Sequence, residues 1–360
     1  MKRYNALIQK TVLTVIIAAC FSSCAIKEEA SDDTATAEAR GFMQVDVTED
    51  NGTAADRMET VRFFVFKNVA AGAPTLELNQ KFDIPSAGDG KEASKFNITL
   101  ETTMRPGKNN EKMVVAVVNE PSAMTQELNE VSDYSSLRNT RLDLSLFLNE
   151  GRTALQAGKT MPMTGVVWSN KVYPTLKEAE DDPEPMEVLR AVARVDIYIN
   201  QEAGLGLTMA EGSTFSLSGL YDEEYLARHV TDTQRFGRIQ TVTSGFKTKG
   251  ITLAASDNLT LPEFTSGQKG RLVASFYTAE RTCAAAQNAD KLEANINIVT
   301  HEGAPRGGTL VIDQLNREGA LTDVLEITRN NIYEIIVTVR TNGITAGVNS
   351  WNDEDIVSDL

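Results

Sequence analysis

The sequence has few of the residues from which metal sites and covalent active sites are built. It contains 3 cysteines and 2 histidines among 360 residues. Cys20 and Cys24 lie in the N-terminal segment, so Cys283 is the only cysteine in the body of the chain and no disulfide can form within it. Zinc and the later transition metals prefer cysteine and histidine ligands. We therefore predict neither a metal site nor a cofactor.

Positive charge and long apolar runs are also scarce. The formal net charge is −15 at pH 7, and an acidic surface of this kind is repelled by nucleic acid, so no nucleic-acid partner is expected. Aromatic residues make up 6% of the chain, and no group of tryptophans suggests a platform for stacking sugars. The one long apolar run, residues 11–19, is too short to cross a bilayer as a mature helix.

That apolar run follows Lys2, Arg3 and Lys10, which is the order of a secretory signal peptide. It leads into Phe-Ser-Ser-Cys, which resembles the lipobox of bacterial lipoproteins. The resemblance implies removal of residues 1–23, acylation (palmitate among the acyl chains) of Cys24 and anchoring in the outer membrane. Cys20 is the alternative lipidated residue. The acidic, Ser/Thr/Ala-rich residues that follow Cys24 cannot bury apolar surface and are expected to form a tether.

The rest of the chain is dominated by short β-runs separated by turn residues. Residues 41–47 alternate apolar and polar side chains, and residues 61–66 and 113–118 are apolar enough for central strands. Residues 132–148 are the best helical candidate in the first half. An acidic, proline-bearing stretch at residues 176–186 suggests a domain boundary. We predict an all-β protein of two β-sandwich domains with a few short helices, at residues 58–187 and 188–360 after a tether and first strand at 24–57.

Four stretches together resemble the fimbrillins, the pilin subunits of Bacteroides-type (type V) fimbriae. They are the lipoprotein signal, the first strand with its arginine-bearing loop, the Leu-Arg-x-Val-Ala-Arg block within residues 188–199, and residues 329–339 followed by Val-Asn-Ser-Trp. The resemblance implies two tandem transthyretin-like β-sandwiches. It also implies a structural subunit of a cell-surface fimbria that serves adhesion. Such a precursor is exported as a lipoprotein and cut by an arginine-specific protease, then assembles head to tail with other fimbrial subunits by donor-strand exchange.

Carried onto this sequence, the resemblance gives a leaving strand at residues 41–47 and a propeptide cleavage site between Arg57 and Met58. Arg40 is the rival cleavage site. The donor strand falls within residues 344–360, with apolar positions at Ile344, Val348, Trp351, Ile356 and Val357. Alternatively, the Val-Asn-Ser-Trp stretch is simply the last strand of the second sandwich.

No nucleophile and base fall in a catalytic motif, and His229 and His301 each have polar neighbours, so we predict that the protein is not an enzyme. Two other functions stay open beside the polymerising pilin. One is a monomeric surface-anchored lipoprotein that binds glycan or protein. The other is a tip or accessory pilin that accepts a strand without donating one. A β-sandwich hydrolase would require two facing carboxylates in a cleft, with raised pKa values.

Overall fold

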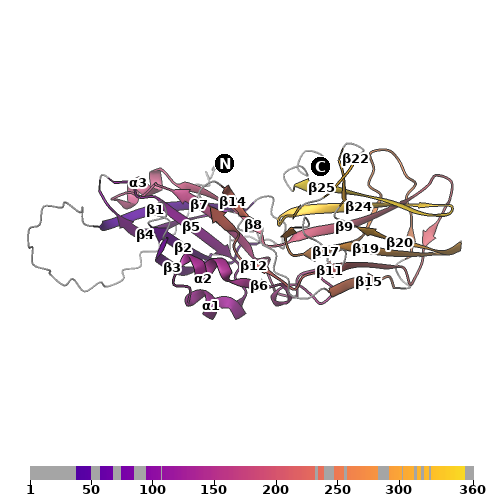
Figure 1. The fold of residues 1–360 in the computed structure, drawn as a ribbon, viewed down its shortest axis with the longest axis horizontal. Helices are drawn as coiled ribbons and strands as arrows, with labels where there is room; N and C mark the ends of the chain where they lie inside the picture. Colours follow the sequence, from indigo (N-terminus) through magenta and orange to yellow (C-terminus); the bar gives the residue numbers. More distant parts are fainter. Residues whose placement is uncertain are drawn as a thin grey trace, which may run out of the picture.

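The structure is a computed structural model that describes residues 38–49, 57–67, 74–84, 95–106, 108–231, 234–238, 247–254, 258–282, 292–301, 303–311, 314–317, 320–323 and 326–352. Strands dominate it, which confirms the predicted all-β class. The molecule is elongated, with the indigo and magenta strands at one end and the orange and yellow strands at the other (Figure 1). Among the described residues, none of the helices has the length and apolar content needed to cross a membrane.

The first half forms a seven-stranded sheet in the order β3-β2-β5-β7-β8-β1-β4. Its strands are β1 (Ala39–Glu49), β2 (Thr60–Lys67), β3 (Thr75–Asp83), β4 (Lys95–Met104), β5 (Lys112–Val118), β7 (Met163–Ser169) and β8 (Glu184–Arg190). Residues 61–66 of β2 and all of β5 are buried, and apart from Arg62 and Lys112 these buried side chains are apolar. The sheet curls until its two end strands, β3 and β4, come into contact.

The second half forms two sheets that enclose a core of their own. One has the order β17-β9-β24-β25, made of β17 (Arg271–Thr278), β9 (Ala193–Gln201), β24 (Asn331–Arg340) and β25 (Gly343–Asn352). The other has the order β15-β11-β19-β10-β16, with β20 added beside β19. Its strands are β10 (Thr208–Met209), β11 (Thr214–Leu220), β15 (Lys247–Thr252), β16 (Leu259–Thr260), β19 (Glu293–Thr300) and β20 (Gly303–Val311).

Short elements complete the fold. Two-stranded ladders join β6 (Arg141–Asp143) to β12 (Glu223–Tyr225), β13 (His229–Thr231) to β14 (Gln234–Arg238), β18 (Arg281–Thr282) to β23 (Glu326–Ile327), and β21 (Gln314–Arg317) to β22 (Ala320–Asp323). The helices are η4 (Ser122–Met124), α1 (Thr125–Asn129), α2 (Tyr134–Asn139), η5 (Leu144–Leu146) and α3 (Leu176–Asp181).

The single helix predicted at residues 132–148 is wrong. α2 is capped by the Asp133 carboxylate, which accepts a hydrogen bond from Ser136 N at 2.8 Å, and it ends at Asn139. The chain then becomes extended so that β6 can pair with β12, and Leu142 at its centre is fully buried. Pairing with a distant strand therefore prevails over the local helical pattern.

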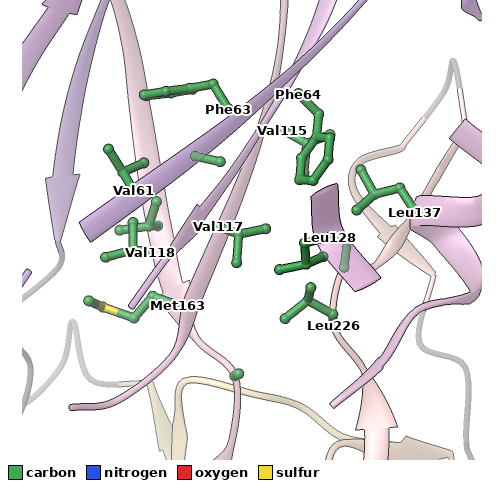
Figure 2. Close-up of a cluster of buried hydrophobic side chains, with 14 of the residues drawn as sticks. Val61, Phe63, Phe64, Val115, Val117, Val118, Leu128, Leu137, Met163 and Leu226 are labelled. Atoms are coloured by element: carbon green, nitrogen blue, oxygen red, sulfur yellow. The ribbon is translucent and has the colours of Figure 1, made fainter. Parts of the chain in front are cut away.

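The N-terminal core extends further along the sequence than the expected boundary at residue 187. β8 crosses that position and contributes Met186 and Val188 to the N-terminal core. The chain passes between the two cores at Val192 and Ala193, then returns to place Leu226 in the N-terminal core. Figure 2 shows Leu226 beside Leu128 and Val117. The acidic residues 176–186 are not a linker, because they form α3 and the start of β8.

Candidate functional site

The candidate site is the position that β1 occupies between β4 and β8, defined here as the β1 position. β1 pairs antiparallel with β4 from Ala39 to Thr48 and parallel with β8 from Val45 to Glu49. Nearer its start, the Phe42 N–H donates to Tyr173 O and the Tyr173 N–H donates to Phe42 O, at 2.8 and 2.9 Å. The first described strand is therefore an interior strand of the sheet, hydrogen-bonded on both sides.

The inward face of β1 completes the N-terminal core. Met43, Val45 and Val47 are fully buried, while the residues between them are half-buried. Burying three such side chains stabilises the fold by about 1.5–3 kcal/mol each. Gly41 occupies the same face, where a Cβ would come within 2.7 Å of Val172 Cγ1. The alternation predicted for residues 41–47 is confirmed.

One outward residue of β1 weakens this fit. The Asp46 Oδ1 atom is buried and has no hydrogen-bond partner among the described residues. Its partner in the parallel pairing of β1 with β8 is Pro185, which has no N–H to donate. A buried acceptor without a partner costs about 1–3 kcal/mol. β1 is thus held by its apolar face and its backbone, and opposed by Asp46.

A buried ion pair attaches β4 to β3 on the side away from β1. Glu77 on β3 accepts hydrogen bonds from Thr102 Oγ1 at 2.7 Å, from Thr103 N at 2.5 Å and from Lys112 Nζ at 2.6 Å. Burial alone would raise the pKa of Glu77, but the hydrogen bonds from Lys112, Thr103 and Thr102 hold it below its ordinary value of 4.5. Among the described strands β4 pairs with β1 alone, so this carboxylate is a second attachment of β4 that does not depend on β1.

The predicted cleavage site lies where the N-terminal sheet resumes after β1. The Arg57 side chain is about half exposed and forms an ion pair with Glu59, but Met58 is 2% exposed. Asn119 Nδ2 donates to the Arg57 carbonyl oxygen at 2.8 Å, and Asn119 Oδ1 accepts from Glu59 N at 2.8 Å. A protease needs an extended segment with free backbone groups, so cutting this bond requires local opening around Asn119.

The rival site at Arg40 lies within β1 and not before it. Arg40 is paired with Thr103 of β4, and its side chain forms an exposed ion pair with Glu101 at 2.5 Å. Cutting after Arg40 would require β1 to leave β4 first.

The arrangement of strands resembles that of proteins found on bacterial surfaces. A protein from Parabacteroides distasonis ATCC 8503, described as a cell adhesion protein, has a TM-score of 0.56 at 12% identity, over 88% of this chain and 100% of its own. The tip fimbrial protein Mfa3 from Porphyromonas gingivalis, truncated at its C-terminus, has a TM-score of 0.54 at 14% identity, over 87% and 100%. The chain has the fold of the Bacteroidales fimbrial proteins. No family model matches the sequence, and no curated protein is similar to it in sequence.

Within this fimbrial fold, the predicted donor positions divide into two groups. Ile344, Val348 and Trp351 lie on β25, which pairs with β24 from Gly343 to Asn352 and ends the four-stranded sheet. Ile356 and Val357 lie outside the described residues, as does the lipidation site Cys24. In the monomer, the described part of the predicted donor is thus a strand of the second sandwich.

The two sequence blocks that carried the resemblance meet at the junction of the fimbrial fold. β9 and β24 pair in parallel, and the Asn330 N–H donates to Val192 O at 2.9 Å just before β24 begins. Asn330 has a φ of 63°, a left-handed conformation that asparagine tolerates better than most residues. The backbone N–H of Arg190 donates to Asn330 Oδ1 at 3.4 Å.

A buried charge cluster at the same junction was not foreseen from the sequence. Arg329 donates to Thr164 Oγ1 on β7 at 3.1 Å and contacts Glu280 at 3.1 Å and Glu224 at 4.0 Å. Burial raises the pKa of Glu224 to about 8, although Arg329 opposes the shift. For Glu280, the charges of Arg329 and Arg228 outweigh burial and lower the pKa. The acidic residues lie far apart in sequence, so no local motif could have indicated the cluster.

Glu224 and Glu280 are two neighbouring buried carboxylates, so they can be compared with the paired carboxylates of a hydrolase. They are 1% and 3% exposed, and the Glu280 N–H donates to Glu224 Oε2 at 3.0 Å. Two glycosidase carboxylates must flank a substrate in an open cleft, and this pair is sealed from solvent. Elsewhere, His301 is exposed and its Nε2 lies 2.8 Å from Asn258 Oδ1. Within the described ranges, no cluster of three His, Cys, Asp or Glu residues could hold a metal ion.

Proposed function

We propose that this protein is a structural subunit of a cell-surface fimbria that accepts a strand from another subunit after β1 is released. Three findings support the proposal: the fimbrial fold, the interior position of β1, and the location of β1 before all the other described strands. In this proposal the precursor is exported as a lipoprotein acylated at Cys24, and a protease cuts between Arg57 and Met58.

The observation that carries the proposal is the place of β1 in the covalent chain. Residues 50–56 form the covalent connection between β1 and the rest of the sheet. A single cut after Arg57 therefore converts β1 from a covalent part of the N-terminal sandwich into a bound peptide. Loss of that peptide leaves two unpaired ladders, on β4 and β8, above the surface that Met43, Val45 and Val47 covered.

An incoming strand restores both ladders and the covered apolar surface in one event, which is β-augmentation. Donor and acceptor surfaces differ, so the contact is heterologous and extends head to tail. Where this chain donates a strand to another kind of subunit, that strand is β25 with the residues after it. β25 lies at the end of its sheet and can leave β24 without dividing the second sandwich.

The test is to treat the exported form with an arginine-specific protease in the presence of other fimbrial subunits, sequence the new N-terminus and follow polymer formation in the same sample. Cleavage at Met58 with polymers that resist unheated detergent is expected. An Arg57→Gln variant should remain monomeric under the same treatment. Polymers formed equally well by that variant would remove Arg57 from the mechanism. A cut chain that stays monomeric with every fimbrial partner would refute the strand-accepting subunit.

A second candidate is ligand binding by an anchored monomer. It is favoured by an open hollow of about 260 Å³ on the second sandwich, lined by Thr214, Ser216, Asn295, Ile296, Asn297, Gly307, Gly308 and Thr309. The lining carries hydroxyl and amide groups and no charged side chain, which suits a neutral sugar. Binding on a glycan array that is lost in Asn297→Ala and kept in Arg57→Gln would favour this function.

A further inference from the structure

The side chains of β1 show which residues fit into the β1 position. Its inward residues, at alternate positions, are Gly41, Met43, Val45 and Val47, and all four are buried. These four inward-facing positions are called levels below. Protein interiors are close-packed, so a strand that replaces β1 must carry side chains of about the same volume at each level. The levels are fixed by the flanking registers, in which Val45 lies opposite Ile98 of β4 and Glu184 of β8.

The Gly41 level is the most restrictive. A Cβ there would lie 2.7 Å from Val172 Cγ1, 3.1 Å from Met104 Cβ and 3.3 Å from Met104 Cγ. Val172 is buried and is held between neighbours, since its N–H donates to Asn170 O and the adjacent Tyr173 is bonded to Phe42. Only glycine enters this level without displacing Val172.

The C-terminal strand of this chain does not meet these requirements. The glycines among residues 331–360 are Gly343 and Gly347, and the residue two positions away on either side of each is Thr341, Thr345 or Asn349. Gly41 is followed at alternate positions by three apolar residues. Neither Gly343 nor Gly347 is followed by such a series in either direction along the strand.

The best alternative in the C-terminal strand runs in the reverse direction. It places Ile344, Ala346 and Val348 at the levels of Val47, Val45 and Met43, and Ser350 at the level of Gly41. The serine Cβ meets Val172, and alanine and valine leave space where valine and methionine were. The fit is poor at three of the four levels.

Building on the proposed function, we infer that the β1 position takes a strand from a different subunit and not from a second copy of this chain. The partner strand carries glycine, a large apolar residue and two β-branched residues at alternate positions. The protein then joins two kinds of subunit, since copies of it do not polymerise with one another.

The test uses the chain without residues 1–24, with a specific protease site inserted in residues 50–56 so that it does not depend on Arg57. After cutting, a fluorescent label on β1 reports its release when competitor peptides are added in mild urea. The competitors are residues 39–49, the same peptide with Gly41→Val, the same peptide with Val45→Ala, and residues 343–353.

We expect the unaltered 39–49 peptide to displace β1 and the other three to compete at least about 100-fold more weakly. Equal competition by residues 343–353 would overturn the inference, because the protein could then polymerise with itself. Equal competition by the Gly41→Val peptide would remove the glycine requirement. If even the 39–49 peptide cannot exchange, the strand-accepting function itself fails, and this outcome is distinct from the other two.

Discussion

Glu77 should decide whether β4 stays in place, and Glu77→Gln tests this. The carboxylate accepts three hydrogen bonds, one of them from the Lys112 ammonium, whose side chain is 3% exposed. Glutamine has the same shape but no charge, and its amide group turns a donor toward other donors. Removing one partner of a buried ion pair costs about 3–5 kcal/mol because the other charge is left uncompensated.

Each kcal/mol lowers the midpoint of thermal unfolding by about 2–4 °C for a domain of roughly this size, so a fall of about 6–20 °C is expected. The assay is thermal unfolding of the uncut chain at pH 7, followed by near-ultraviolet circular dichroism. Glu101→Gln is the matched control, because the same substitution on β4, next to the Thr102 that Glu77 contacts, removes only an exposed pair with Arg40. Its expected cost is below about 1 kcal/mol.

The pH dependence adds a second readout for Glu77. Its pKa is lower in the folded chain than the ordinary 4.5, so its contribution is fully present above that pH and is lost as the pH falls through the folded value. The difference between the wild type and Glu77→Gln should therefore shrink on acidification below about pH 4.5. Equal melting temperatures for Glu77→Gln and Glu101→Gln would refute the reasoning.

Three further predictions concern the cleavage bond, the strand and the junction. Glycine tolerates the positive φ of Asn119 (54°), and Asn119→Gly removes the hydrogen bond to the Arg57 carbonyl oxygen. Cleavage after Arg57 should therefore accelerate about tenfold. An unchanged rate would contradict the need for local opening. Asp46→Val removes the unpartnered buried oxygen and should slow dissociation of the cut β1 about tenfold, measured by fluorescence, whereas faster release would contradict this. Glu224 keeps its proton to about pH 8 when folded and loses it near 4.5 when unfolded, so stability should fall as the pH rises between these values. Glu224→Gln should flatten that fall in urea titrations, while Glu223→Gln, at an exposed pair, should retain it; equal slopes in both would refute the assignment.

Much of the strand content was predictable, because burial on one face or both leaves a direct imprint on the sequence. The alternation in residues 41–47 and the apolar run of β5 are examples. The place of β1 between β4 and β8 was not predictable from its own residues, since it depends on pairing with Glu184–Arg190 far along the chain. The resemblance of residues 329–339 to fimbrillins indicated a family block but not the buried contacts of Arg329.

The parallel pairing of β1 with β8 also limits the order in which the chain can fold. Val45 pairs with Glu184, so β1 cannot be enclosed on both sides until residues 184–190 have been synthesised. Contacts between segments so distant in sequence form slowly, because the intervening chain must first be ordered. The N-terminal sandwich therefore closes late, and the backbone groups of β1 that face β8 have no partner in that strand until β8 arrives.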